Sequence, residues 1–385
     1  MVNNTIPSIQ YIKSLGKEKS IENFNLLIKL FNDNLPIDVK REIVSSIGRQ
    51  NESDLVYNFL IENAFSAHPM ELVYQMYRTC LYRGKDDFRF ASLGEKIKDF
   101  YNNEIINKMH SYYVYRQKRH KRTSNKKHIT HPLLLKGDVA EKLKKFPEQS
   151  VQMIFTSPPY YNAREYSDYH SYKDYLDKIK NVFTACNRVL EDGRFIIVNI
   201  SPVITKRPGR EFESIRYPIH YDYHKILEES GFYFVDEIVW IKPEPSVPNR
   251  IGGYMQTRKP LSYKPNCITE SLMVYRKNCD FLLDKNINDY KEYNKYENEE
   301  IDTTNCWYIT PKSDKNHPAV FPEELCKRVL KYYSYEGDVI MDPFAGSGTL
   351  GRVAKQMNRI PIMCEMNEEY IKLIKNTEEN YYYDI

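Results

Sequence analysis

Residues 156–160, Thr-Ser-Pro-Pro-Tyr, place a hydroxyl, a carbonyl and an aromatic ring on a stiff piece of backbone. The apolar residues 151–155 before them predict a buried parallel strand, and two consecutive prolines cannot continue a sheet. The chain must therefore leave the sheet at the end of this strand. There the Ser157 hydroxyl and the Pro158 carbonyl can accept hydrogen bonds from the amino group of a flat ring such as a nucleobase, beside Tyr160.

Residues 342–349, Asp-Pro-Phe-Ala-Gly-Ser-Gly-Thr, form a glycine-rich turn at a predicted helix start. An apolar run from Asp338 predicts another buried strand before them, and a helical pattern continues to Met357. The glycines allow a ligand to approach closely, and the free N–H groups of the helix start favour anionic atoms. Glu365 ends the next predicted strand, where an acid can bind a ribose diol. Alone, the Pro-Pro-Tyr turn fits an ordinary loop or a polyproline ligand as well, but the two stretches together favour a cofactor-dependent site.

These two stretches resemble the motifs of the DNA amino-methyltransferases, which use S-adenosyl-L-methionine to methylate exocyclic nitrogens of bases. Residues 157–160 match the catalytic motif of that family, and residues 342–349 match its cofactor motif. The catalytic motif comes first in the sequence, which is the permuted order of the family's beta group. The resemblance runs from Leu133 to the C-terminus and implies an α/β fold with a doubly wound, mostly parallel, seven-stranded Rossmann-like sheet. The two motif strands are expected to be neighbours in that sheet.

The resemblance also implies roles for individual residues. The expected catalytic residues are Ser157, Pro158, Pro159 and Tyr160. The expected cofactor-binding residues are Asp138, Thr156, Asp342, Phe344, Gly346, Ser347, Gly348, Thr349 and Glu365. Asp138 follows a glycine at the family's place for an acid that contacts the adenine amine of the cofactor. An aspartate that caps the following helix is the competing interpretation of this residue.

Methylation of carbon 5 of cytosine needs a cysteine nucleophile, and neither motif stretch contains a cysteine. Methylation of an exocyclic amine needs no covalent intermediate, only acceptors that aim the nitrogen lone pair at the methyl group. By the resemblance, serine at the start of the tetrapeptide implies cytosine-N4 as the target, although a serine hydroxyl can also accept a proton from adenine-N6. Neither amine can be reached inside a duplex, so base flipping is implied.

Three parts are expected along the chain. Residues 1–112 show helical spacing of apolar residues and a weak repeat that aligns Leu27 with Leu60; they resemble HEAT-type repeats, and an ordinary helical bundle is the alternative. Residues 113–130 form a basic linker that could follow a phosphate backbone or only connect the domains. Residues 131–385 form the methyltransferase domain, with a target-recognition insertion at 243–311.

Composition limits the kinds of binding site, cellular location and partner that can be expected for this chain. The formal net charge is only +4, so DNA binding has to rest on local basic clusters. Seven cysteines without paired spacing indicate neither a metal site nor a disulfide framework, and without an apolar run of membrane length a cytoplasmic location is expected. The expected partners are double-stranded DNA and, in a restriction-modification system, a restriction endonuclease with the same site. An RNA or protein methyltransferase and a non-catalytic DNA-binding scaffold are the rival interpretations.

Overall fold

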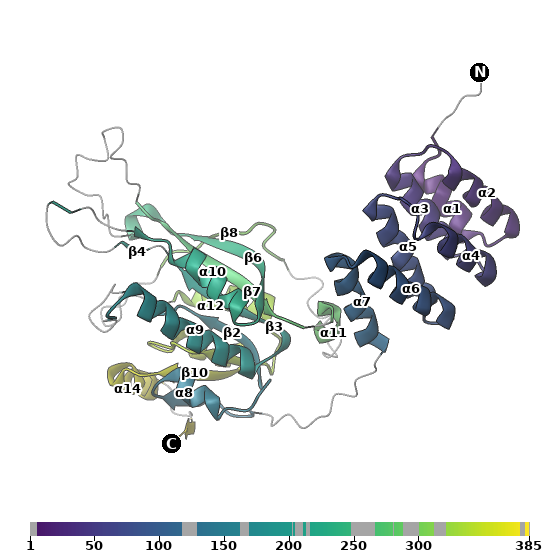
Figure 1. The fold of residues 1–385 in the computed structure, drawn as a ribbon. Coiled ribbons are helices and arrows are strands. Elements are labelled where there is room, and N and C mark those ends of the chain that lie inside the picture. The colour runs from purple at the N-terminus through teal and green to yellow at the C-terminus, as the bar shows by residue number, and fades with distance from the viewer. Residues whose placement is uncertain are drawn as a thin grey trace. The chain divides into compact units, whose positions relative to one another are not determined.

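The structure, a computed structural model, forms two compact units, Met1–Lys121 and Arg122–Ile385. We refer to them as the helical unit and the sheet unit (Figure 1). The described residues are 6–117, 129–161, 169–201, 203–204, 211–212, 216–247, 266–279, 281–287, 300–311, 321–377 and 382–384. Among them, no helix is long and apolar enough to cross a membrane.

Helices make up the regular structure described in the helical unit, as the spacing of its apolar residues predicts. They are α1 (Ile9–Lys17), α2 (Ile21–Asn32), α3 (Ile37–Gly48), α4 (Ser53–Asn63), α5 (Met70–Arg83), α6 (Phe88–Tyr101) and α7 (Glu104–Gln117). Helix α7 continues to Gln117, so the start of the expected linker 113–130 is helical. The most basic part of that linker, residues 118–128, lies outside the described residues.

Small residues set the spacing of α1, α3 and α5. A Cβ atom added to Gly16 of α1 would lie 2.5 Å from Ser46 Oγ of α3, and one added to Gly48 of α3 would lie 2.4 Å from Thr79 Cγ2 of α5. The same kind of close contact therefore recurs one helix pair later, which agrees with the repeat seen in the sequence. Assignment to HEAT-type repeats stays a prediction.

The sheet unit contains a nine-stranded sheet in the order β11-β1-β10-β9-β2-β3-β7-β6-β8. Its strands are β1 (Leu133–Lys136), β2 (Val151–Thr156), β3 (Leu190–Ile200), β6 (Phe232–Ile241), β7 (Thr269–Lys277), β8 (Cys306–Tyr308), β9 (Val339–Asp342), β10 (Ile360–Glu365) and β11 (Tyr382–Asp384). Only β7 runs antiparallel to its neighbours in this sheet. The predicted mostly parallel α/β sheet is confirmed, and the short strands β11 and β8 extend it at its two edges.

Helices cover both faces of this sheet, which makes it doubly wound (Figure 1). The helices are α8 (Val139–Lys144), α9 (Tyr172–Val189) and α10 (Ile219–Glu229) on one face, α12 (Glu323–Tyr333) and α13 (Thr349–Gln356) on the other, and α14 (Glu368–Thr377) beside β10. Strand β2 contributes to the hydrophobic cores on both faces of the sheet. Ile154 packs towards α9, whereas Met153 and Phe155 pack towards α12. A strand buried on both faces is mostly apolar, as residues 151–155 are apart from Gln152.

Shorter elements complete the sheet unit. They are β4 (Val203–Ile204), β5 (Arg216–Tyr217), the 3-10 turn η1 (Glu244–Ser246) and α11 (Leu283–Ile287). Strands β7 and β8 both fall inside the expected target-recognition insertion 243–311. Strand β7 separates two segments of this span, residues 248–265, 280 and 288–299 of it lie outside the described residues, and its role in target recognition stays a prediction.

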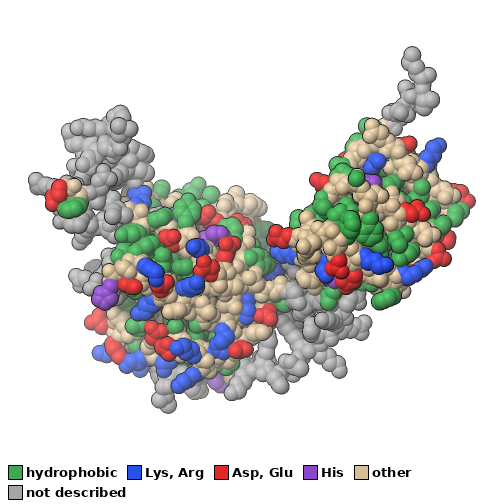
Figure 2. Space-filling view, in the orientation of Figure 1, with side chains coloured by type: hydrophobic (Ala, Val, Ile, Leu, Met, Phe, Trp, Pro, Cys, Tyr) green, Lys and Arg blue, Asp and Glu red, His purple; other side chains and the backbone are tan. Residues whose placement is uncertain are grey.

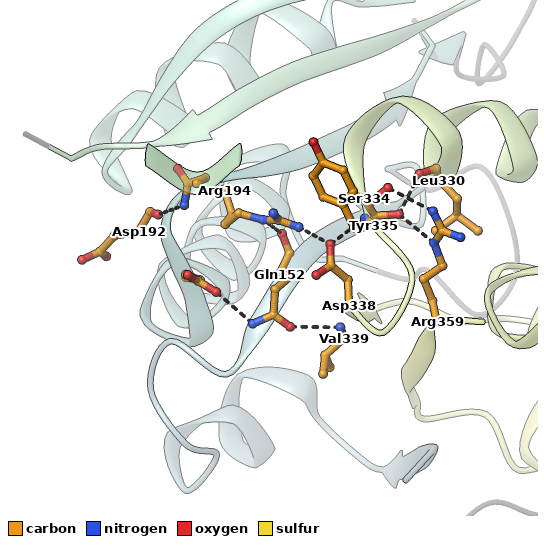
Figure 3. Close-up of polar contacts among 11 residues, drawn as sticks. Gln152, Asp192, Arg194, Leu330, Ser334, Tyr335, Asp338, Val339 and Arg359 are labelled. Carbon is orange, nitrogen blue, oxygen red and sulfur yellow. Dashed lines mark hydrogen bonds and ion pairs between the residues drawn. The ribbon is translucent and has the colours of Figure 1, made fainter. Parts of the chain in front are cut away.

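A buried polar cluster fixes how the amino ends of β2, β3 and β9 meet (Figure 3). Arg194 of β3 forms an ion pair with Asp338, and its Nε donates to the Gln152 carbonyl of β2 at 2.8 Å. The Gln152 side chain in turn accepts a hydrogen bond from Val339 N of β9 at 2.9 Å. These bonds link β2 and β3 to β9 and to Asp338 directly before it, so a slip of one residue between β2 and β9 would break the cluster.

Replacing Arg194 by alanine should lower the free energy of unfolding by about 3–5 kcal/mol, because it leaves the carboxylate of Asp338 buried without this partner. Urea denaturation of both proteins measures the loss. Lys173→Ala is the matched control, since Lys173 pairs with Asp177 on the surface with side chains 82% and 57% exposed. That change should cost about 0.5 kcal/mol or less. Losses of equal size in the two variants would contradict this role for the buried pair.

Candidate active site

One buried hydrogen bond joins the two motif stretches. Thr156 ends β2 and Asp342 ends β9, and these strands are parallel neighbours with Ile154 opposite Met341. The Thr156 hydroxyl donates to Asp342 Oδ1 at 2.7 Å, with both residues almost fully buried. The expectation that the motif strands are adjacent is confirmed. Residues far apart in sequence thus meet at the carboxyl ends of two central strands, where open α/β sheets bind ligands.

The glycine-rich turn begins at the same aspartate. Asp342 Oδ1 also accepts a hydrogen bond from Phe344 N at 3.0 Å, which bends the chain away from β9. Gly346 and Gly348 have φ angles of 51° and 78°, a region that favours glycine. A Cβ atom on Gly348 would lie 3.0 Å from Ile374 Cγ1, a tight contact that adds to the conformational preference for glycine there. Helix α13 then begins at Thr349 with Gly348 as its N-cap.

Glu365, at the end of β10, holds the turn in place. Its Oε2 accepts from Gly346 N at 2.7 Å, and its Oε1 accepts from Met366 N and Asn367 N at 2.8 Å each. Burial raises the pKa of Glu365 above its ordinary value. A carboxylate can accept about four hydrogen bonds, so this geometry leaves room for a ligand hydroxyl. Glu365 therefore shapes the turn in addition to the ribose-binding role expected from the sequence.

Asp138 lies at the end of the next strand along the sheet. It follows β1, which pairs with β10, and Gly137 N donates to the Glu365 carbonyl at 3.0 Å. Asp138 Oδ1 accepts from Ala140 N at 2.9 Å and Glu141 N at 3.3 Å, so it is the N-cap of α8. The capping interpretation is correct. It leaves Oδ2 able to accept another bond, so capping and cofactor contact are compatible.

Residues 157–160 leave the sheet directly after β2, as two prolines require. Pro158 is buried, whereas Ser157, Pro159 and Tyr160 are partly exposed. The Ser157 hydroxyl lies beside the Tyr160 phenol, where it partly offsets the effect of burial on the pKa of that phenol. Burial raises the pKa of Tyr160 well above its ordinary value of 10, at which the phenol is already neutral near pH 7. The tetrapeptide thus presents uncharged acceptors and an aromatic ring beside the Asp342 turn.

The remaining expected cofactor residues are on the same turn. Phe344 is partly exposed, whereas Ser347 and Thr349 are buried and their hydroxyls lie 3.4 Å apart. This contact supports the loop, and the cofactor-binding role expected for Ser347 and Thr349 stays a prediction. The cofactor-binding residues expected from the sequence therefore include some that stabilise the glycine-rich turn and others whose polar atoms lie beside it.

Three polar residues that the sequence did not single out form a connected group next to Ser157. Asn199, near the end of β3, places its Nδ2 3.5 Å from Ser157 Oγ and 2.5 Å from Glu270 Oε2 of β7. Lys242, directly after β6, forms an ion pair with Glu270. The available signal was a polar residue at the end of an apolar strand, but only the strand order shows that these three ends meet at Ser157.

Charge is mixed on the face of the sheet unit that Figure 2 shows. On the face shown in Figure 2, Lys and Arg side chains are interspersed with Asp and Glu side chains. This pattern agrees with the net charge of +4. Among the described residues, no group of His, Cys, Asp and Glu side chains could hold a metal ion.

A family model described as DNA methylase matches residues 151–376, more than half of the chain. The chain belongs to the DNA methylase family. The matched residues include the strands β2, β3, β7, β9 and β10 and every candidate site residue except Asp138. S-adenosyl-L-methionine is the cofactor of this family, as expected from the sequence.

Individual relatives of this methylase match its sheet unit. The type II methyltransferase M.HpaI of Haemophilus parainfluenzae is 29% identical over 63% of this chain and 72% of its own length. The type II beta methyltransferase M.BslI of a Bacillus species is 27% identical over 63% of this chain, which spans only 27% of that protein. TTHA0409 of Thermus thermophilus, solved with S-adenosyl-L-methionine, is 26% identical with a TM-score of 0.48, over 64% of this chain and 92% of its own.

The methylase site has the groups that this cofactor needs. Gly346 and Gly348 keep the turn free of side chains, so a ligand can approach the backbone. Glu365 offers a remaining acceptor for a ribose hydroxyl, and Asp138 offers one for an adenine amine. All of them lie at the carboxyl ends of the neighbouring strands β1, β10 and β9.

Asp342 should make the stability of this methylase depend on pH. Burial raises its pKa from 3.8 to about 7. The folded chain therefore keeps this proton to a higher pH than the unfolded chain, and the free energy of unfolding should fall between about pH 4 and pH 7. A shift of about three pKa units corresponds to a decrease of a few kcal/mol in the free energy of unfolding. Asp342→Asn retains the acceptor Oδ1 but cannot titrate, so this decrease should be absent in the variant.

Urea denaturation of both proteins at about pH 5 and about pH 7.5 measures this difference, and the comparison cancels the groups that the two proteins share. An Asp342→Asn variant with the same pH dependence as the unchanged protein would show that Asp342 titrates as an ordinary carboxylate.

Proposed function

We propose that this chain transfers the methyl group of S-adenosyl-L-methionine to the exocyclic N4 of cytosine in double-stranded DNA. The observation that carries the proposal is the bond between Thr156 and Asp342, which puts the acceptor tetrapeptide next to the cofactor turn. Family membership supports methylation of a DNA amine. Ser157 at the first position of the tetrapeptide favours cytosine-N4, because the resembled enzymes with serine at that position are cytosine-specific.

The site's own residues supply orientation rather than a strong base. The Ser157 hydroxyl and the Pro158 carbonyl would accept the two amine protons, which pulls the nitrogen towards tetrahedral geometry and frees its lone pair. The bound cofactor supplies an electrophilic methyl group on sulfur. Positive charge grows on the nitrogen during transfer, so hydrogen bonds from its protons strengthen and favour the transition state. Correct alignment alone can be worth about 7–11 kcal/mol.

The stiffness of residues 157–160 matters for this reason. Two prolines fix φ, and Pro158 is buried, so the acceptors cannot drift from their places. The Tyr160 ring can fix the plane of the target base by stacking. Reaching the amine requires the base to leave the duplex, at a cost of a few kcal/mol.

The biological setting follows from the relatives. M.HpaI and M.BslI are type II methyltransferases by name, which supports a role as the modification enzyme of a restriction-modification system. Such an enzyme works in the cytoplasm and has a partner endonuclease that cuts the same site. The basic linker 113–130 would hold the phosphate backbone, and the two segments within 243–311 would read the target sequence. The helical unit would serve as a binding module.

Adenine-N6 is the second candidate target, because the matched family covers both amines and a serine hydroxyl can accept a proton from either. The deciding experiment transfers tritiated methyl groups from S-adenosyl-L-methionine to unmethylated genomic DNA and, separately, to total RNA. Nucleosides from the digested products are then identified by mass spectrometry. We expect N4-methylcytosine in DNA. N6-methyladenine alone would refute the base assignment, and label in RNA alone, or none at all, would refute the function.

Two variants separate the roles of the two motifs in this assay. Ser157→Ala should lose most methyl transfer, on the order of 100-fold, while its affinity for S-adenosyl-L-methionine is unchanged. Glu365→Gln should instead weaken cofactor binding, because its amide cannot accept from backbone N–H groups and a ribose hydroxyl as the carboxylate does. Isothermal calorimetry measures both affinities. An unchanged rate in Ser157→Ala would remove the serine from the mechanism.

A further inference from the structure

A chain of polar side chains extends from Ser157 across three neighbouring strands. Asn199 is on β3, Glu270 is on β7, and Lys242 directly follows β6, so all of them lie at one edge of the sheet. Asn199 is 2% exposed, and the side chains of Lys242 and Glu270 are 16% and 15% exposed. A charged pair held this close to a candidate catalytic serine, and largely out of water, acts strongly on its neighbours.

The contacts in this chain have a fixed direction. An ammonium can only donate and an ionised carboxylate can only accept, so Lys242 donates to Glu270 Oε1. Glu270 Oε2 therefore accepts a hydrogen bond from Asn199 Nδ2, at a distance of 2.5 Å. The same Nδ2 faces Ser157 Oγ at 3.5 Å. The opposite orientation of the amide would place its oxygen against a carboxylate.

Asn199 Oδ1 shows that this orientation is imposed. It is a buried oxygen with no hydrogen-bond partner among the described residues. An unsatisfied buried acceptor costs about 1–3 kcal/mol, and turning the amide would move that oxygen towards the Ser157 hydroxyl. The amide nevertheless keeps its NH2 group on the carboxylate, which is consistent with a charge-assisted hydrogen bond of about twice the usual strength.

Ser157 is thereby left with one defined function. Its hydroxyl oxygen has two lone pairs, and the NH2 group of Asn199 faces one of them, so the second is left for another donor. A target amine needs an acceptor of this kind. We propose that Glu270, held by Lys242, is a positioning residue that orients Asn199 so that Ser157 accepts a hydrogen bond from the target amine. This inference rests on the proposed function, which it deepens.

The test compares Glu270→Gln with the unchanged protein in methyl transfer to DNA. Glutamine can donate to Asn199 Oδ1, so the amide can turn and Ser157 loses its fixed orientation. We expect kcat to fall by about 100-fold, with KM for DNA and the cofactor Kd changed less than about twofold. Ser271→Ala is the matched control, because Ser271 follows Glu270 on β7 but its hydroxyl donates to Glu237 at an exposed site. Its kcat should be unchanged.

Lys242 provides a second, independent variant if Glu270→Gln does not fold. Lys242→Met should lower kcat by about tenfold, and Lys242→Arg, which keeps the ion pair, should restore it. A kcat within about twofold of the unchanged protein in Glu270→Gln or in Lys242→Met would overturn the proposal. So would a parallel loss of kcat, cofactor affinity and melting temperature, which indicates a structural role. An unchanged protein that transfers no methyl group to DNA would refute the proposed function itself.

Discussion

The site depends on the alignment of two parallel strands, β2 and β9, whose ends meet through the bond from Thr156 to Asp342. This bond is made in the interior, where Asp342 loses the hydration that would favour its charge. The carboxyl group is retained there because it also fixes the start of the glycine turn through Phe344 N. The buried carboxyl group of Asp342 thus links the two motif stretches and fixes the backbone turn that follows β9.

The amino ends and the carboxyl ends of these strands have different roles. At the amino ends, the cluster around Arg194 and Asp338 sets the pairing of β2, β3 and β9 (Figure 3). At the carboxyl ends, polar residues are left partly open to a ligand, as in Ser157 and Glu365. Rigid pairing at one end allows groups at the other end to be held in place without being buried completely. The acids Asp138 and Glu365 serve both purposes, because each fixes backbone and retains acceptor capacity.

Local pattern was enough to predict much of this arrangement. The largely apolar stretches 151–155 and 339–341 predict the motif strands, and the prolines and glycines after them predict the turns. The sheet class followed from the resemblance, and the helical character of residues 1–112 followed from the spacing of apolar residues. Asn199 and Glu270 could not be found this way, because their meeting depends on β7 inserting between β3 and β6. The edge strands β8 and β11 are three residues long, which is too short for an alternating apolar and polar pattern to be recognised in the sequence.

The placement of the cofactor tests the central claim most directly. A crystal structure with S-adenosyl-L-methionine, or with an analogue that cannot donate its methyl group, would show it. We predict that the adenosine lies over the ends of β1 and β10, near Asp138 and Glu365, with the sulfur towards the ends of β9 and β2 and facing Ser157. Density that places the adenosine away from Asp138 and Glu365, or that turns the sulfur away from Ser157, would contradict the account.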